Sequence, residues 1–237
     1  MVEVLGILRQ VLMTIKRLFS ENEDMRFLGF TSLMFLVGPS CFAQTWAVGI
    51  GGGYGAYENA TVKNAAGTSA EAGFRSRVAA TAVLTEDMFE HIGGELRYTY
   101  RDGGSQFRAN GQGVDMDAVA HVVHYDFLFY GTRRHARVRP FFAAGAGIKR
   151  YDATGRGLQP FDGFGTLTHT HQVEGMVSAG AGVKVALGDR WVLRLDFRDY
   201  MTPFPETLFR PPVNASVHGW LHDFVPMIGV DWTFGGR

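Results

Sequence analysis

The chain has 237 residues, with 23 basic and 23 acidic side chains, one cysteine and 31 glycines. Zero formal net charge argues against a nucleic-acid-binding protein, and a single cysteine excludes a disulfide framework or a paired-cysteine metal site. Aromatic residues make up 13% of the chain, which excludes disorder, while glycine is nearly twice as frequent as the roughly 7% of an average protein.

The N-terminal part contains a segment typical of a secretory signal peptide, residues 25–43. It has a cationic start at Met25, an apolar run over Phe27–Val37, a break at Pro39 and a small residue, Ala43, at its end. The alternative is a transmembrane anchor, but the run is shorter than the about 20 residues that a spanning helix needs. We therefore expect cleavage after Ala43.

Residues 1–24 precede that signal and have apolar residues at helical spacing, followed by an acidic cluster at 21–24. An acidic cluster is out of place before a signal peptide. We interpret 1–24 as a mis-assigned start, with translation beginning at Met25; the alternative is a true N-terminal extension.

From residue 44 onward the hydrophobic period changes from helical to two, and it stays so to the end of the chain. Eight segments alternate in this way, each of ten residues or more, whereas strands of ordinary globular proteins have a mode of roughly 5–6 residues. Strands of about 9–11 tilted residues are what a bilayer requires. The segments are Trp46–Ala56, Phe74–Leu84, Phe89–Arg101, Met116–Tyr130, Val138–Tyr151, Gln172–Leu187, Trp191–Tyr200 and Leu221–Phe234.

The connections between these segments alternate between long and short. Long polar stretches occupy Tyr57–Gly73, Asp102–Asp115, Asp152–His171 and Met201–Trp220. This alternation is typical of an up-and-down barrel with tight turns at one end and long loops at the other. We therefore predict an all-β fold, an eight-stranded antiparallel transmembrane β-barrel over residues 44–237.

The two faces of the segments indicate which side faces lipid. One face is aliphatic with aromatic residues towards its ends, as in the interfacial girdles of a membrane barrel. The other face combines glycine, alanine and serine with charges of both signs, which suits the crowded interior of an eight-stranded barrel. We predict that these charges form a lumenal ion-pair cluster: Arg75, Arg77, Glu95, Arg97, Glu174, Lys184, Arg194, Asp196, Arg198 and Asp231.

Four stretches resemble the small OmpA-like outer-membrane β-barrels of Gram-negative bacteria: Phe141–Ile148, Ala179–Val185, Trp191–Tyr200 and the final Gly229–Phe234. The resemblance covers residues 44–237.

In that family the last strand is a recognition signal for the barrel-assembly machinery, which implies this role for Val230, Trp232 and Phe234. The chain departs from the pattern by continuing past Phe234 with two glycines and Arg237.

Residues that could carry chemistry have simpler interpretations. The pairs His169/His171 and His218/His222 would need a third ligand to bind a metal, so we expect no metal and no cofactor. Some small barrels modify lipid A with a serine and a histidine near the outer rim, but no His-x-Ser element occurs on a lipid-facing segment here. We therefore assign no catalytic residue.

The sequence thus predicts an integral protein of the cell outer membrane, with a structural or surface-interaction role through four long extracellular loops. Its expected partners are outer-membrane lipid and lipopolysaccharide, the assembly machinery during insertion, and an unidentified extracellular ligand; nucleic acid is not expected. The alternatives are a lipid A-modifying enzyme and a narrow channel.

Overall fold

The computed structural model describes residues 45–63, 68–109, 111–155, 159–161, 165–209, 216–218 and 220–235. The predicted extension at 1–24 and signal peptide at 25–43 lie outside the described residues. No helix in the described part of the chain is long and apolar enough to cross a membrane.

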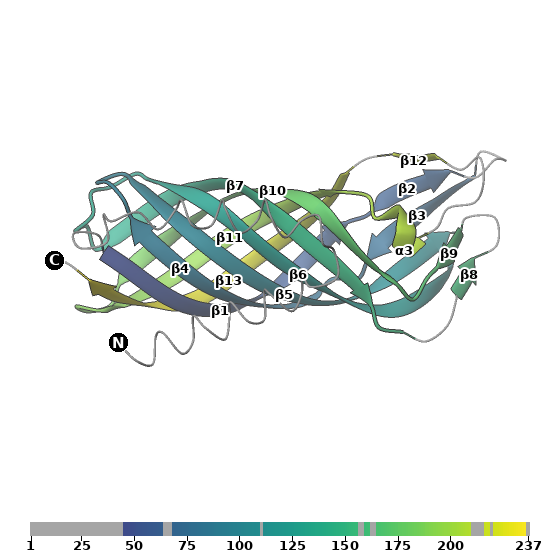
Figure 1. Ribbon diagram of the computed structural model, residues 1–237, viewed down its shortest axis with the longest axis horizontal. Helices are drawn as coiled ribbons and strands as arrows, with labels where there is room; N and C mark the ends of the chain where they lie inside the picture. The colour runs from purple at the N-terminus through teal and green to yellow at the C-terminus, as the bar shows by residue number, and fades with distance from the viewer. Residues whose placement is uncertain are drawn as a thin grey trace, which may run out of the picture. The chain divides into compact units, whose positions relative to one another are not determined.

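The described residues form a closed ring of eight antiparallel strands, so the predicted fold is confirmed (Figure 1). Each strand pairs with the next one in the ring, and the last pairs back with the first. In ring order the strands are β1 (Thr45–Glu58), β4 (Arg77–Asp87), β5 (Ile92–Ala109), β6 (Gln112–Tyr130), β7 (Val138–Ala153), β10 (His171–Ala186), β11 (Trp191–Pro203) and β13 (Trp220–Gly235).

Where the structure describes them, the stretches predicted as long loops are largely regular structure, which corrects the sequence interpretation. β5 and β6 run on as a hairpin beyond the ring, and short elements stand beside them at the same end of the barrel, opposite the tight turns (Figure 1). We call this part the extension. Its short elements are β2 (Ala60–Lys63), β3 (Ser69–Phe74), β8 (Gln159–Phe161), β9 (Gly165–Leu167), α3 (Glu206–Phe209) and β12 (Ser216–His218).

The same alternation that makes the barrel also makes the extension. In β2, Ala60 and Val62 are buried whereas Thr61 and Lys63 are exposed. β3 pairs with the outer part of β5, and β2 pairs with β3, so the sheet continues sideways past the ring. The sequence interpretation missed these strands because they are short and lie between polar turn residues.

The extension has its own apolar core, which lies over the mouth of the barrel. Phe74 stacks on Tyr151 with ring centroids 4.7 Å apart, and Phe209 of α3 meets Phe74 and Phe107 edge-on at 5.4 and 5.5 Å. Apart from Phe204, the other members are small or aliphatic. They include Ala72, Met116, Ala118, Leu167, Leu208 and Leu221.

Glycines on the inner side of β1 let the strands and lumenal side chains come close. A Cβ atom on Gly51 would lie 2.8 Å from the carbonyl oxygen of Ile228 in β13, which is closer than a side chain tolerates. A Cβ on Gly55 would collide with the guanidinium of Arg101. Glycine is therefore needed at these positions because a larger residue would clash with the neighbouring strand or side chain.

Candidate functional site

The lumen of the barrel is filled by a network of charged side chains, and Glu95 of β5 lies at its centre. Glu95 is fully buried and forms ion pairs with three arginines: Arg97 at 2.6 Å, Arg198 at 3.3 Å and Arg194. Its Oε2 also accepts a hydrogen bond from the Thr85 hydroxyl, at 3.3 Å. One carboxylate from β5 thus ties together arginines of β5 and β11.

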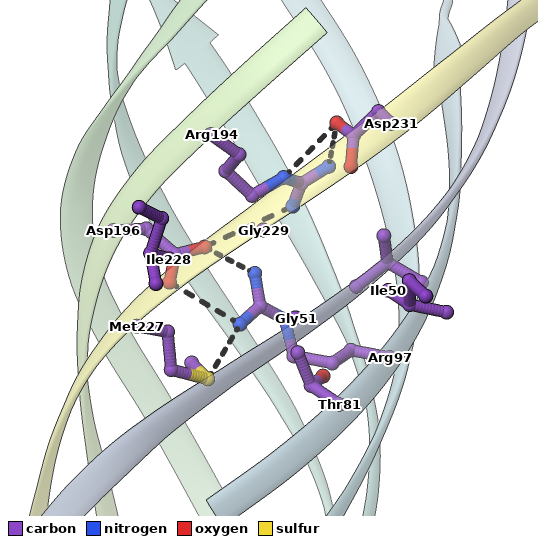
Figure 2. Close-up of a pocket in the computed structure, with 11 residues that line it drawn as sticks. Ile50, Gly51, Thr81, Arg97, Arg194, Asp196, Met227, Ile228, Gly229 and Asp231 are labelled. Atoms are coloured by element: carbon purple, nitrogen blue, oxygen red, sulfur yellow. Dashed lines mark hydrogen bonds and ion pairs between the residues drawn. The ribbon is translucent and has the colours of Figure 1, made fainter.

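The arginines are shared with further carboxylates on other strands. Arg194 donates to Asp231 of β13 at 2.7 Å, and Arg97 pairs with Asp196 of β11, as Figure 2 shows. Arg198 pairs with Asp126 of β6 at 3.2 Å. The network therefore crosses the lumen and links strands on opposite sides of the ring.

We call the eight charged residues of this network the lumenal cluster. It has four cations and four carboxylates, all buried, so its formal charges balance. The members are Glu95, Arg97, Asp126, Lys184, Arg194, Asp196, Arg198 and Asp231. Charges so buried must be paired, since an unpaired one would carry the full cost of its desolvation.

A second, smaller group of buried charges lies between the lumenal cluster and the extension. Asp223 of β13 accepts from Arg101 at 2.8 Å and from Lys149 at 2.7 Å. The Lys149 ammonium lies over the rings of Tyr57 and Tyr151, 4.7 and 5.2 Å from their centroids. Aromatic faces attract such a cation, so the rings complete its surroundings.

The structure has a small cavity in the lumen. A cavity of about 10 Å³ lies beside the lumenal cluster, lined by Gly51, Arg97, Arg194, Asp196 and other residues (Figure 2). A cavity must offer roughly 10–15 Å³ to hold one water molecule. The lumen at this level is therefore packed with side chains.

Seven of the ten residues predicted for the ion-pair cluster lie together in it, while Arg75, Arg77 and Glu174 do not. Arg75 pairs with Asp117 at 3.2 Å, and Arg77 pairs with Asp102 at 3.3 Å. Both arginines lie near the bend between β3 and β4, level with the extension rather than with the cluster.

Glu174 shares the inner face of β10 with Lys184 but lies ten residues from it, about 33 Å along an extended strand. It accepts a hydrogen bond from Gln172 there.

The predicted ion-pair cluster did not include several charged residues that the structure places in the lumen: Asp126, Arg101, Lys149 and Asp223. The signal was present, because all four fall on the inner face of their strands by alternation. Asp126 also accepts from His124 Nδ1 at 2.9 Å, and Ser178 Oγ donates to Asp126 Oδ2 at 3.4 Å.

The other predicted positions lie outside the lumen. Trp232 and Phe234 of the proposed assembly signal stack at 5.5 Å, and Val230 is exposed on the same face of β13. His222 Nδ1 donates to Asp199 Oδ2 at 2.8 Å. Among the described residues, no group of three His, Cys, Asp or Glu side chains is placed to hold a metal ion.

The outer wall of the ring is apolar. Ile50, Phe142 and Ile228 are 73%, 72% and 57% exposed, although large apolar side chains are normally buried. Trp191 is exposed towards the tight turns, and Trp220 is exposed where β13 leaves the extension. A closed ring leaves no unpaired strand edge, which lipid would not tolerate, and an apolar wall with aromatic residues near both ends is that of a bilayer-spanning barrel.

The protein is an eight-stranded membrane-spanning β-barrel. In outer-membrane barrels the tight turns face the periplasm and the longer connections face outward, so we expect the extension of this barrel to be extracellular.

Comparisons with known proteins gave structural neighbours only: no family model and no curated protein matches the chain. Neisserial surface protein A is similar at 11% identity over 80% of this chain and 97% of its own, with a TM-score of 0.47. The outer membrane protein AlkL is 13% identical over 84% and 93%, with a TM-score of 0.46. Ail of Yersinia pestis, in complex with the heparin analogue sucrose octasulfate, is 13% identical over 81% and 100%, with a TM-score of 0.42.

Proposed function

We propose that this barrel has a non-enzymatic role at the cell surface of a Gram-negative bacterium: it anchors an ordered extracellular extension and makes contacts through it. The observation that supports this most directly is the apolar core of the extension, built on Phe74, Phe107 and Phe209. Loops that only connect the strands of a barrel need no such core. Ordering the chain around a core costs conformational entropy, which packing must offset.

Hydrogen bonds also hold the extension in one arrangement. Thr168 donates its hydroxyl to the carbonyl of Thr207 at 2.7 Å, and its backbone N–H to that of Leu208 at 2.9 Å. The Thr207 N–H in turn donates to the side chain of Gln172 at 2.9 Å. A surface fixed in this way can bind with a smaller loss of entropy than a flexible loop.

The outer side of the extension is charged and accessible. Arg108 pairs with Asp115 at 2.6 Å, and Arg75 lies 4.0 Å from the same carboxylate. Such exposed pairs add little stability, about 0–1 kcal/mol each. The charged side chains of these pairs can therefore exchange partners with an extracellular ligand. The apolar wall contacts outer-membrane lipid and lipopolysaccharide. The last strand engages the assembly machinery during insertion.

The test compares cells that lack the protein with cells that carry the full chain or the Arg75→Glu/Arg108→Glu variant. We expect the full chain to raise attachment of cells to a panel of matrix-coated and host-cell surfaces, and the variant to lose much of that gain at equal surface amount. Equal attachment with and without the protein would contradict a surface-contact role. A change in lipid A mass spectra on adding the protein would instead indicate an enzyme.

A further inference from the structure

The periplasmic end of the barrel carries several exposed arginines in its tight turns. In the turn between β6 and β7, Arg133, His135 and Arg137 are exposed, and in the turn between β10 and β11 Arg190 is exposed. None of these three arginine side chains forms an ion pair with a described residue. Asp189 is the acidic residue in the same pair of turns. The two turns together therefore have a cationic excess.

The first of these turns is held in a fixed shape, so its arginines are directed outward rather than collapsed onto the barrel. The Gly131 N–H donates to the carbonyl of Pro140 at 2.9 Å. Arg134, in the middle of the turn, donates through its side chain to the carbonyl of Asp87 at 2.8 Å and through its backbone to Glu90 at 3.3 Å. The second bond engages one carboxylate oxygen of Glu90.

The two turns are neighbours on the rim. The Ala186 N–H donates to the carbonyl of Arg137 at 2.8 Å, which joins the end of β10 to the start of β7. The Thr233 N–H donates to the carbonyl of Arg190 at 2.8 Å, and the Arg190 guanidinium lies 5.9 Å from the ring centroid of Trp232. The two turns therefore form one sector of the rim over β6, β7, β10 and β11, with the Arg190 guanidinium towards β13.

Directly beside this sector the outer wall is strongly apolar. Val138 is 49% exposed, Phe142 72%, Leu187 59% and Trp191 55%, and all four lie on the strands that the two turns connect or at their ends. An apolar wall that ends in a row of unpaired arginines matches a molecule with acyl chains and an anionic head.

We propose that this sector is a binding site for anionic glycerophospholipids of the periplasmic leaflet. The phosphodiester group lies against Arg133, Arg137 and Arg190, and the acyl chains lie along the apolar wall between Phe142 and Trp191. Guanidinium groups suit this ligand because their planar donors match phosphate oxygens in pairs. A lipid fits both halves of the site, whereas an acidic polymer of the periplasm would leave the apolar half unused.

The test uses the full chain with Trp191 as its reporter, after Trp46, Trp220 and Trp232 have been replaced by phenylalanine. The protein is folded into phosphatidylcholine vesicles that contain the same fraction of brominated phosphatidylglycerol or of brominated phosphatidylcholine. Each arginine near a membrane surface is worth about fivefold in affinity for anionic lipid, so with screening we expect enrichment on the order of tenfold beside Trp191. Quenching by the brominated anionic lipid should therefore exceed quenching by the neutral one, and the excess should fall as salt is raised.

Two variants decide the outcome. Arg133→Gln/Arg137→Gln/Arg190→Gln should abolish the excess quenching, while Arg75→Gln/Arg77→Gln/Arg108→Gln, which removes the same charge from the other end, should preserve it. Heat-dependent migration on gels checks that both variants are folded. Equal quenching by the two brominated lipids in the unaltered rim would overturn the proposal, and so would binding of isolated peptidoglycan that depends on the three rim arginines without any lipid enrichment.

Discussion

Replacing Glu95 by glutamine tests how much the lumenal cluster contributes to folding. The carboxylate faces Arg194, Arg97 at 2.6 Å and Arg198 at 3.3 Å, and its side chain is fully buried. Glutamine keeps the size but presents an amide N–H₂ group to donors, and it leaves Arg194 and Arg198 with fewer carboxylates to share. Removing one partner of a buried pair costs about 3–5 kcal/mol. We therefore expect the free energy of unfolding of the Glu95→Gln variant to fall by about that amount.

The measurement is urea unfolding of the full chain in phospholipid vesicles, followed by loss of the heat-modifiable gel band and extrapolated linearly to zero urea. Glu174→Gln is the matched control, because Glu174 is a partly exposed carboxylate on an inner strand face, away from the cluster. It should change the free energy of unfolding by no more than about 0.5 kcal/mol. If Glu95→Gln unfolds at the same urea concentration as the unaltered chain, the cluster does not stabilise the barrel and the reasoning is wrong.

Two further substitutions test the packing of the wall and of the extension. Gly51→Ala should cost about 1–3 kcal/mol in unfolding free energy, since the new methyl group meets the Ile228 carbonyl, while Gly175→Ala, with no atom within 4 Å, should be tolerated in the same urea assay. Phe209→Ala should cost about 3–5 kcal/mol of local stability and make the extension sensitive to added protease, with the barrel still heat-modifiable. Phe89→Ala at the opposite end is the control; unchanged proteolysis of the Phe209→Ala extension would show that its core is not needed.

The period of two, maintained over eight segments, was sufficient to predict the barrel and the direction of most side chains. Each strand has one apolar face, and a slip of one residue would turn charges such as Arg97 and Arg194 towards lipid. The register is therefore strongly constrained by burial. For the same reason seven residues predicted for the cluster lie on the inner face and meet there.

Which inward residues meet across the lumen could not be predicted, because strand tilt and stagger set their heights. Alternation alone treats Glu174 and Lys184 alike, although they stand far apart along β10. Alternation also gives no reason to separate Asp223, which pairs with Arg101 and Lys149, from the lumenal cluster. The extension was missed for a different reason: its strands are stabilised by packing on Phe209 and its neighbours, which local pattern does not reveal.

The lumen of the membrane-spanning ring is blocked in the middle by the lumenal cluster and at its outer end by the apolar core of the extension. Current through a planar lipid bilayer tests this most directly. We expect the inserted full chain to give no steady single-channel current at moderate voltage, since the cavity beside Arg97 and Asp196 is only about 10 Å³. A stable, reproducible conductance from the unaltered protein would contradict it.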